Sequence, residues 1–384
     1  MPRAARSLVT EARPTLEELL VSGGDGRLAL DLASGVNMYG CTPRPRRDGD
    51  GLSSSTASTI SEYSYRRAKE SWDRLSLCNG PACFNDFVEE ARAELKGYLG
   101  IHEIEAEVVF SPSGTDSQLL SLFLVRAMLG TPLVSVIVGA DQTGSGTAYT
   151  AKGLHFADRE ILRKGHAVEG LADGISSIAI PFCDYEGNPR TLADLDHDIT
   201  SVVDAAVADG AHVLLQTMAS SKLGWGAPSD DCIEQLTRRW PDKVSIVVDA
   251  CQMRIGATRI QNYVACGYIV LITGSKFFCG PPFSGALLIP ACLCDAIAAI
   301  SEVSRGLRDY SRRFDWPSCW PELRDAFPAA ANIGQWLRWE AALAEMRDYH
   351  AVPATFRASV LRRFAQTQPL WKGLKALPPR IYFS

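Results

Sequence analysis

Short apolar runs, separated by longer amphipathic segments, dominate the middle of the chain. Seven runs are rich in Val, Ile and Leu, as buried strands are. Most gaps between them are long enough for a helix, which predicts a mixed or mainly parallel α/β sheet. The last two runs are separated only by Gly, Pro and Phe, so their connection is expected to be an antiparallel return. The runs occupy residues 107–111, 133–139, 177–180, 212–216, 245–249, 268–273 and 285–290.

Helical periodicity flanks these runs. Before the first run it predicts a short helix over 16–22 and a longer one over 84–99. After residue 290 apolar positions recur at a period of 3.6 in 292–303, 332–346 and 352–366. Trp336, Leu337 and Trp339 form an aromatic stripe in this part, and we expect the stripe to be core packing.

This organisation predicts three regions. Residues 1–60 form an arm and a loop rich in Pro, Arg, Gly and Ser, and residues 61–300 form an α/β large domain. Residues 301–384 form a smaller, mostly helical domain. Residues 381–384 resemble the start of a strand, so this small domain is expected to be incomplete.

Composition excludes several classes of protein. The chain has 384 residues, of which 46% are hydrophobic and 22% charged, as in a soluble globular enzyme of about two domains. The net charge of −5 gives no reason to expect nucleic acid or an anionic membrane as a partner. No apolar stretch is long enough to span a bilayer, and no signal peptide precedes the arm. A cytoplasmic location is therefore expected.

The eleven cysteines form no CxxC pair. An odd number of scattered cysteines in a chain of this size favours reduced thiols over a disulfide framework. The spacing of a four-ligand zinc site is also missing, so no metal is expected.

Three polar elements stand at the ends of predicted strands. Ser113, Gly114 and Thr115 follow the first run and open a helix, where backbone N–H groups and hydroxyls bind anions. Asp249 ends the fifth run, and Lys276 follows the sixth. An anion cradle, a buried acid and a buried lysine are the groups that pyridoxal phosphate requires.

Each of these elements also has an ordinary structural explanation. Ser or Thr is a common helix N-cap, Asp249 could cap the following helix, and a lysine can extend along apolar surface to reach water. An unpaired buried carboxylate is costly, however, and Phe277, Phe278 and Gly280 after Lys276 favour a pocket. The three elements together favour a cofactor site.

Asp249 and Gln252, followed on the next strand by Thr273, Ser275 and Lys276, resemble the fold type I pyridoxal-phosphate enzymes. Within these the chain resembles the class V aminotransferase branch, which includes phosphoserine aminotransferase, cysteine desulfurase and kynureninase. The resemblance covers about residues 85–345 and implies a three-layer large domain with a mainly parallel seven-stranded sheet, a smaller C-terminal domain and a homodimer.

The resemblance also implies roles for individual residues. Lys276 would hold pyridoxal 5′-phosphate as an internal aldimine and act as general base, and Asp249 would keep the ring nitrogen protonated. Gln252 would lie near the 3′-oxygen of the cofactor. The remaining residues expected to bind the cofactor are Ser113, Gly114, Thr115, Gln142, Thr143, Ser221, Thr273 and Ser275.

Two segments depart from the family pattern. In 138–147, where relatives place an aromatic or imidazole side chain over the ring, Gln142 and Thr143 align best. This Gly/Ser-rich segment could instead wrap the substrate or be a flexible connection. In 216–226, where relatives commonly carry Asn, this chain offers Ser220, Ser221 and Lys222, of which Lys222 could also face solvent.

Substrate contacts are expected from two parts of the chain. Asn37 and Tyr39 belong to a segment that resembles the one lying over the substrate in many fold type I enzymes. A substrate carboxylate is expected to meet an arginine of the small domain, and the sequence does not choose among its candidates. Tyr63 and Tyr65 could reach the phosphate of a neighbouring subunit or be surface tyrosines. The candidate arginines are Arg312, Arg313 and Arg380.

The expected function is that of a pyridoxal-phosphate enzyme acting on an amino acid, with aminotransferase activity first. A lyase that performs elimination or cleaves C–C or C–S bonds is the alternative. Desulfurase chemistry needs a cysteine beyond the lysine, and none of Cys279, Cys292, Cys294 and Cys319 is a clear counterpart. A cofactor-binding protein without turnover is a third hypothesis. A dinucleotide-binding protein is disfavoured because no GxGxxG follows the first strand.

Overall fold

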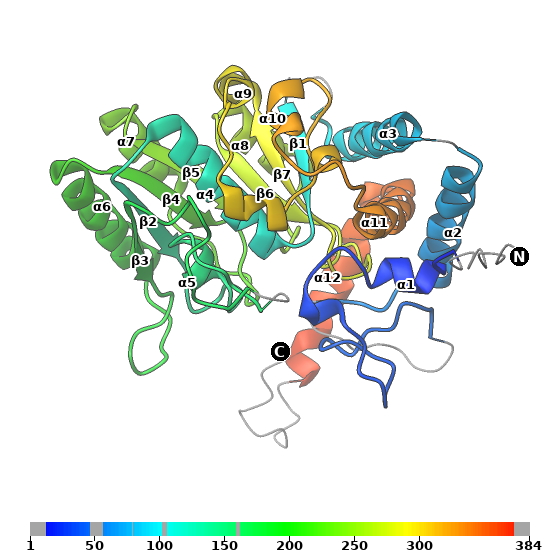
Figure 1. Ribbon diagram of the computed structural model, residues 1–384. Coiled ribbons are helices and arrows are strands. Elements are labelled where there is room, and N and C mark those ends of the chain that lie inside the picture. The colour runs from blue at the N-terminus through cyan, green and yellow to red at the C-terminus, as the bar shows by residue number, and fades with distance from the viewer. Residues whose placement is uncertain (1–12, 47–56, 79, 102–105, 159–161, 372–384) are drawn as a thin grey trace, which may run out of the picture.

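A seven-stranded sheet lies at the centre of the protein, a computed structural model of which describes residues 13–46, 57–78, 80–101, 106–158 and 162–371 (Figure 1). The strands are β1 Ala106–Ser111, β2 Leu133–Val138, β3 Ile175–Ile180, β4 His212–Met218, β5 Val244–Asp249, β6 Ile269–Thr273 and β7 Gly285–Pro290. The helices are α1 Leu16–Leu20, α2 Glu62–Ser76, α3 Pro81–Leu99, α4 Gly114–Leu129, α5 Thr147–Thr150, α6 Leu192–Ala208, α7 Asp230–Arg239, α8 Ala257–Ala265, α9 Ala291–Ala298, α10 Pro321–Asp325, α11 Ile333–Ala351 and α12 Ala354–Trp371, with short 3₁₀ helices η1 Gly26–Leu28, η2 Arg305–Asp309 and η3 Arg313–Asp315.

The strand order is β1-β7-β6-β5-β4-β2-β3. β7 is antiparallel to both of its neighbours, β1 and β6, and the other pairs are parallel. β1 therefore runs in the same direction as β6, and the carboxyl ends of all strands except β7 lie at one edge of the sheet. The predicted seven-stranded, mainly parallel sheet and its antiparallel return are confirmed.

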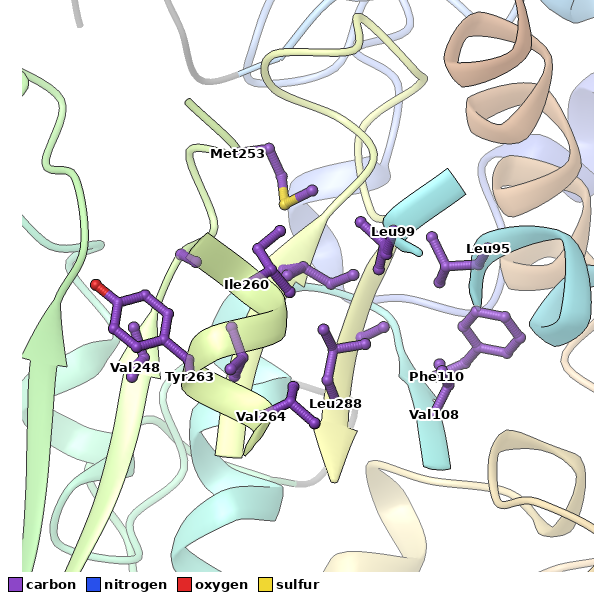
Figure 2. Close-up of a cluster of buried hydrophobic side chains, with 14 of the residues drawn as sticks. Leu95, Leu99, Val108, Phe110, Val248, Met253, Ile260, Tyr263, Val264 and Leu288 are labelled. Carbon is purple, nitrogen blue, oxygen red and sulfur yellow. The ribbon is translucent and has the colours of Figure 1, made fainter. Parts of the chain in front are cut away.

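Two hydrophobic clusters cover the two faces of the sheet. Successive residues of a strand alternate between them, as the pleat requires: Val248 of β5 belongs to one cluster and Val247 to the other. The first cluster includes α3, α6, α7 and α8, and the second includes α4 and α9. In Figure 2, Ile260 and Val264 of α8 lie against the strand residues Val248 and Leu288. Burial of such aliphatic side chains stabilises the fold by roughly 1.5–3 kcal/mol each.

Helix α11 is the centre of a helical layer beside the sheet, where it packs against α1, α2 and α3 (Figure 1). Trp336, Leu337 and Trp339 of α11 are buried, so the prediction that the aromatic stripe is core packing is confirmed. The helix α2 in this layer was not predicted. Although α11 lies beyond residue 300, it packs against helices near the amino end. The predicted domain boundaries stay a prediction.

Arg338 of α11 is completely buried and ties two distant loops together. Its Nε donates to the carbonyl oxygen of Phe283 at 2.8 Å, and its Nη1 donates to those of Leu20 and Ser22 at 3.0 and 2.6 Å. A buried guanidinium is tolerated only when its N–H groups are satisfied in this way. The N-terminal arm and the loop before β7 are therefore held at fixed positions on α11.

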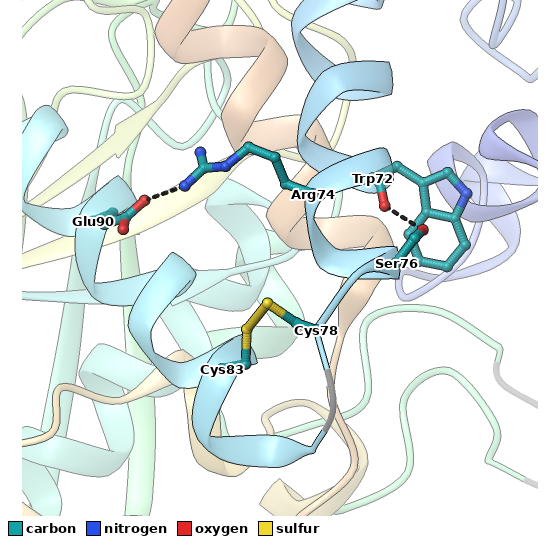
Figure 3. The surroundings of a disulfide bond; sticks show 6 residues. All are labelled: Trp72, Arg74, Ser76, Cys78, Cys83 and Glu90. Atoms are coloured by element: carbon teal, nitrogen blue, oxygen red, sulfur yellow. Dashed lines mark hydrogen bonds and ion pairs between the residues drawn. A yellow bond between two sulfur atoms is a disulfide. The ribbon is translucent and has the colours of Figure 1, made fainter.

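A disulfide joins the segment after α2 to the first turn of α3, between Cys78 and Cys83 (Figure 3). The expectation of reduced thiols throughout is therefore wrong for this pair. The spacing of the pair gives no CxxC signal, and the two side chains meet because the chain reverses between two helices. The other cysteines, all of them in the described ranges, are free thiols.

The buried carboxyl of Asp315 gives the fold a testable dependence on pH. It accepts hydrogen bonds from the backbone N–H of Arg312, the hydroxyl of Ser311 and Nε2 of Gln335. Burial nevertheless raises the pKa of Asp315 to about 6, against 3.8 for the ordinary group. Between pH 3.8 and about pH 6 the Asp315 carboxyl holds a proton in the folded protein that it has lost in the unfolded chain. The stability that this proton contributes is therefore present at low pH and disappears as the pH rises through about 6.

We expect the free energy of unfolding of the wild type to fall by about 2 kcal/mol relative to that of Asp315→Asn between pH 4 and pH 7. Denaturant unfolding at both pH values measures the difference. The control is Asp348→Asn, an exposed acid on α11. A wild type and an Asp315→Asn variant with parallel pH profiles would contradict the assignment.

Candidate functional site

A cavity of about 250 Å³ opens at the carboxyl edge of the sheet, where five strands end close together. The segments that follow β1, β2, β4, β5 and β6 each contribute to its wall, and the N-terminal arm covers it. This is the edge at which open α/β sheets bind ligands. The residues that line the cavity and enter the discussion are Arg27, Met38, Tyr39, Ser113, Gly114, Thr115, Gln118, Gln142, Thr143, Thr147, Met218, Ser220, Ser221, Lys222, Asp249, Cys251, Gln252, Thr273, Ser275, Lys276 and Phe283.

The amino end of α4 forms one wall. Ser113 is its N-cap, and the Ser113 hydroxyl accepts a hydrogen bond from the backbone N–H of Asp116 at 3.3 Å. Gly114 follows at a point of close approach, because a Cβ at this position would lie 2.7 Å from Sγ of Cys251. The first N–H groups of a helix and its dipole favour an anion. With the hydroxyl of Thr115 they form an anion cradle.

Asp249 ends β5 and lies half-buried in the cavity wall. Its Oδ2 accepts a hydrogen bond from Nε2 of Gln118 at 3.3 Å, and its Oδ1 accepts one from the backbone N–H of Cys251 at 3.0 Å. Gln118 is in turn fixed by the hydroxyl of Thr150, which donates to Oε1 at 3.3 Å. These donors orient the carboxylate and stabilise its charge.

Lys276 lies in the loop after β6, and its amine has no hydrogen-bond or ion-pair partner among the described residues. The loop is fixed at its base, since Gly280 donates to the carbonyl of Gly274 at 3.0 Å and Gly274 donates to that of Ser284 at 2.8 Å. A Cβ on Gly274 would lie 2.5 Å from Cβ of Ala342, so the loop packs directly on α11. A rigid loop thus presents an unpaired amine to the cavity.

Two further polar atoms of the cavity wall lack partners. Oε1 of Gln252 and Oγ1 of Thr147 are buried, and neither makes a hydrogen bond within the described part of the chain. Buried polar groups in folded proteins are nearly always paired, so orphaned ones in a cavity indicate a polar ligand. The cradle, the carboxylate, the amine and these two orphaned atoms together fit a polar ligand that carries an anionic group and a group that donates a hydrogen bond to a carboxylate.

The structure brings together every residue expected to bind the cofactor, since all eleven line this cavity. Tyr39, a predicted substrate contact, lines it too. Asn37 lies outside the lining, where its Oδ1 accepts hydrogen bonds from the backbone N–H groups of Tyr39 and Cys41 and so fixes the turn that carries Tyr39. No bound molecule tests these assignments, and they stay predictions.

The segment 220–225 is an ordered turn at the cavity wall. The Ser221 hydroxyl accepts hydrogen bonds from the backbone N–H groups of Leu223 and Trp225 at 3.2 and 3.1 Å. Lys222 lies exposed on this turn and also lines the cavity. Burial, and then the neighbouring charge of Lys276, lower the pKa of Lys222. Lys222 therefore faces both solvent and the cavity.

Sequence reasoning missed Arg27, Gln118 and Cys251. Arg27 precedes every predicted motif, and only the folded arm brings it over the cradle, where its Nη2 lies 3.3 Å from the Ser113 hydroxyl. Gln118 is one turn into α4 and could have been found from helical spacing after Ser113. Cys251 lies two residues after Asp249, but its packing against Gly114 joins the ends of two strands that are far apart in sequence.

The candidate arginines of the small domain are engaged elsewhere. Arg312 lines a neighbouring cavity of about 740 Å³ and donates to the carbonyl of Ser311, and Arg313 pairs with Asp325 at 3.3 Å. Arg380 lies outside the described residues. Tyr65 donates to Glu17 at 2.6 Å, and Tyr63 lies on the same helix, α2. The predicted contact of both tyrosines with a neighbouring subunit stays a prediction.

Comparison with known proteins identifies the fold. No protein-family model and no curated protein matches the chain. An amine transaminase from an uncultivated Pseudomonas species, solved in its PLP-bound (internal aldimine) form, is 14% identical in sequence, with a TM-score of 0.51 over 84% of this chain and 70% of that chain. This chain has the fold of the fold type I pyridoxal-phosphate enzymes.

Two other solved structures are similar at lower scores. The taurine:2-oxoglutarate aminotransferase of Bifidobacterium kashiwanohense has a TM-score of 0.49 and 13% identity over 81% of this chain and 65% of that chain. An S-selective transaminase from Bacillus megaterium has a TM-score of 0.47 and 16% identity over 77% of this chain and 61% of that chain. Scores this low carry no argument, and the class V branch stays a prediction.

Two absences concern the described ranges only. They contain no group of three or more His, Cys, Asp or Glu side chains that could hold a metal ion. None of their helices has the length and apolar character needed to cross a membrane.

The close approach at Gly114 predicts the behaviour of two glycine variants. Gly114→Ala would force its methyl against Cys251, so we expect it to destabilise the fold by roughly 1–3 kcal/mol and to weaken binding of inorganic phosphate. The control is Gly256→Ala at the N-cap of α8, where a Cβ would meet nothing within 4 Å. Denaturant unfolding and calorimetric phosphate titration give the two measurements.

Removing the thiol should rescue the first variant. Gly114→Ala combined with Cys251→Ala is expected to recover stability and phosphate binding relative to Gly114→Ala. Equal phosphate affinity in wild type and Gly114→Ala would show that the amino end of α4 is not an anion site.

Proposed function

We propose that the protein is a pyridoxal-phosphate-dependent enzyme that acts on an amino acid, with aminotransferase as the first activity to test. The observation that carries this proposal is the meeting of the α4 cradle, Asp249 and the unpaired Lys276 in one cavity of a fold type I protein. A helix terminus alone or a lysine alone is common, whereas the three at one edge of the sheet suit one cofactor.

The residues present fit this cofactor. Gly114 and Thr115 would hold its phosphate at the amino end of α4. Gln252 and Thr147, whose buried polar atoms have no partner in the described residues, would meet its polar substituents. Thr273 and Ser275 lie beside the cradle in the same wall, although the Thr273 hydroxyl already donates to the carbonyl of Cys251 at 2.8 Å.

Bound pyridoxal phosphate supplies an aldehyde that condenses with amines and a pyridinium ring that accepts electrons from Cα. Lys276 would provide the amine that anchors the cofactor and, once released, a base for the substrate. Asp249 would keep a ring nitrogen protonated, because an oriented carboxylate favours a charged N–H. Gln118 and the N–H of Cys251 keep that carboxylate in place.

A lyase would use the same residues, and the products distinguish it from an aminotransferase. Persulfide chemistry is disfavoured because Cys251 is the one cysteine of the described lining. Burial, and then Asp249, raise the pKa of the Cys251 thiol well above its ordinary value, so this thiol stays protonated and is a poor nucleophile. The class V affinity, the homodimer and the cytoplasmic location belong to the same proposal.

The anchoring role of Lys276 has a direct chemical test. Protein incubated with pyridoxal phosphate and reduced with borohydride should carry a pyridoxyl group on Lys276, detected by peptide mass spectrometry. Lys276→Ala should carry none. Lys152→Ala, which removes an exposed lysine outside the lining, should be labelled as the wild type is. A label on a different lysine of the wild type would refute the assignment.

Asp249→Asn tests the acid and the reaction together. An amide cannot hold the ring proton by charge, so we expect turnover to fall by about 10²- to 10³-fold while bound cofactor is retained. Turnover is measured with an amino-acid panel by assaying keto acid, ammonia and a released side-chain fragment separately. Keto acid formed only with an amino acceptor indicates an aminotransferase, and free ammonia or a released side-chain fragment indicates a lyase.

The control for this experiment is Asp209→Asn, an exposed acid after α6. Full turnover by Asp249→Asn would remove Asp249 from the chemistry, and a wild type that releases none of these three products would leave the cofactor-binding protein without turnover as the better hypothesis.

A further inference from the structure

The cavity wall carries more positive than negative charge. Arg27, Lys222 and Lys276 line it, whereas Asp249 is the one carboxylate among the described lining residues. A cation of this wall that has no protein partner is therefore available to an anionic ligand. The three cations differ in their partners, and this difference shows which cation is left to bind a substrate.

Arg27 already has its partner. Its Nε donates to Oδ1 of Asp25 at 2.9 Å and its Nη2 donates to Oδ2 at 2.7 Å, the two-bonded geometry in which a guanidinium binds a carboxylate most strongly. Burial opposes its charge, but the ion pair with Asp25 outweighs burial and raises the pKa of Arg27. The Arg27 side chain also covers the Phe283 ring, 4.8 Å from its centroid. Arg27 is thus held by the protein.

Lys222 is the contrasting case. Its ammonium has no hydrogen-bond or ion-pair partner within the described ranges, although its backbone is firmly held. Nη1 of Arg254 donates to the Lys222 carbonyl at 3.0 Å. The Ser221 hydroxyl accepts a hydrogen bond from the backbone N–H of Trp225 and so closes the turn that carries Lys222. A fixed backbone that presents an unpaired cation to a cavity is the arrangement of an anion-binding residue.

The two candidate arginines among the described residues are engaged with other groups. Arg312 and Arg313 are engaged with the carbonyl of Ser311 and with Asp325, and Lys276 is committed to the cofactor by the proposed function. The pKa of Lys222 is lowered by burial and by Lys276, and an anion bound between the two lysines would relieve this repulsion.

We propose that Lys222 binds the carboxylate of the substrate, so that the site takes amines that carry a carboxylate and discriminates against amines that lack one. This inference rests on the proposed function. A charge-assisted hydrogen bond of this kind corresponds to about a tenfold to hundredfold preference.

A matched pair of reagents tests the preference without knowledge of the natural substrate. Aminooxyacetate and methoxyamine both react with the aldehyde of bound pyridoxal phosphate, and they differ in the carboxylate. The second-order rate constant of each is followed by the visible absorbance of the loaded protein. The ratio of the two constants then reports carboxylate recognition alone, because the condensing group is the same.

We expect a high ratio for the wild type, a ratio lower by about tenfold or more for Lys222→Met, and recovery in Lys222→Arg. Lys152→Met is the matched control, because it removes the same charge from an exposed position outside the lining. Methoxyamine rates and pyridoxal-phosphate affinity should stay within about twofold of the wild type in all variants, which excludes a role of Lys222 in holding the cofactor.

The possible failures are distinguishable. An unchanged ratio in Lys222→Met, with methoxyamine still reacting, overturns the role of Lys222 and leaves the proposed function intact. A lower affinity for pyridoxal phosphate in Lys222→Met, with an unchanged ratio, assigns Lys222 to the cofactor and also overturns the inference. A wild type that takes up no cofactor, so that neither reagent changes its absorbance, overturns the proposed function and this inference with it.

Discussion

The antiparallel placement of β7 between β1 and β6 is the constraint on which the site depends. Two successive reversals of direction turn β1 parallel to β6, so the cradle after β1 opens on the same edge as Asp249 and Lys276. With a single reversal, β1 would point the other way and Ser113 would lie at the opposite edge, about a strand length away. Buried side chains on both faces of the sheet fix this order, because each strand must present apolar residues to both clusters.

The same core supports polar groups at the sheet edge that destabilise the protein locally. Lys276 and Lys222 repel each other, and Gln252 and Thr147 each leave a buried polar atom unpaired within the described residues. Phe283, whose ring covers Arg27, has a positive φ of 71°, a conformation that costs about 1–3 kcal/mol in a bulky residue. Arg338 holds the Phe283 carbonyl in place from α11, so the helical layer and the sheet together maintain a strained cavity wall.

The strands and the three central motifs were predictable because their signals are local. A β-branched run that is buried on both faces looks the same in any context, and a polar residue at its end is visible in the sequence. Arg27 and the engaged Arg312 and Arg313 were not predictable in this way. Which arginine lines the cavity depends on how the arm and the segment after α9 fold back over the sheet. The contact of Arg27 with Ser113 joins residues more than eighty positions apart. Arg313 pairs instead with the carboxylate of Asp325.

Sequence alone determined the mainly parallel sheet, the antiparallel return and the chemical character of Ser113–Thr115, Asp249 and Lys276, since these follow from the period of apolar residues and from the groups a strand end carries. Tertiary structure alone decided which groups are paired. Asp25 neutralises Arg27, Cys251 packs on Gly114, Cys78 bonds Cys83, and Lys222 is left without a partner in the described chain. Pairing depends on distances of a few ångströms between side chains, and only the packed structure sets those distances.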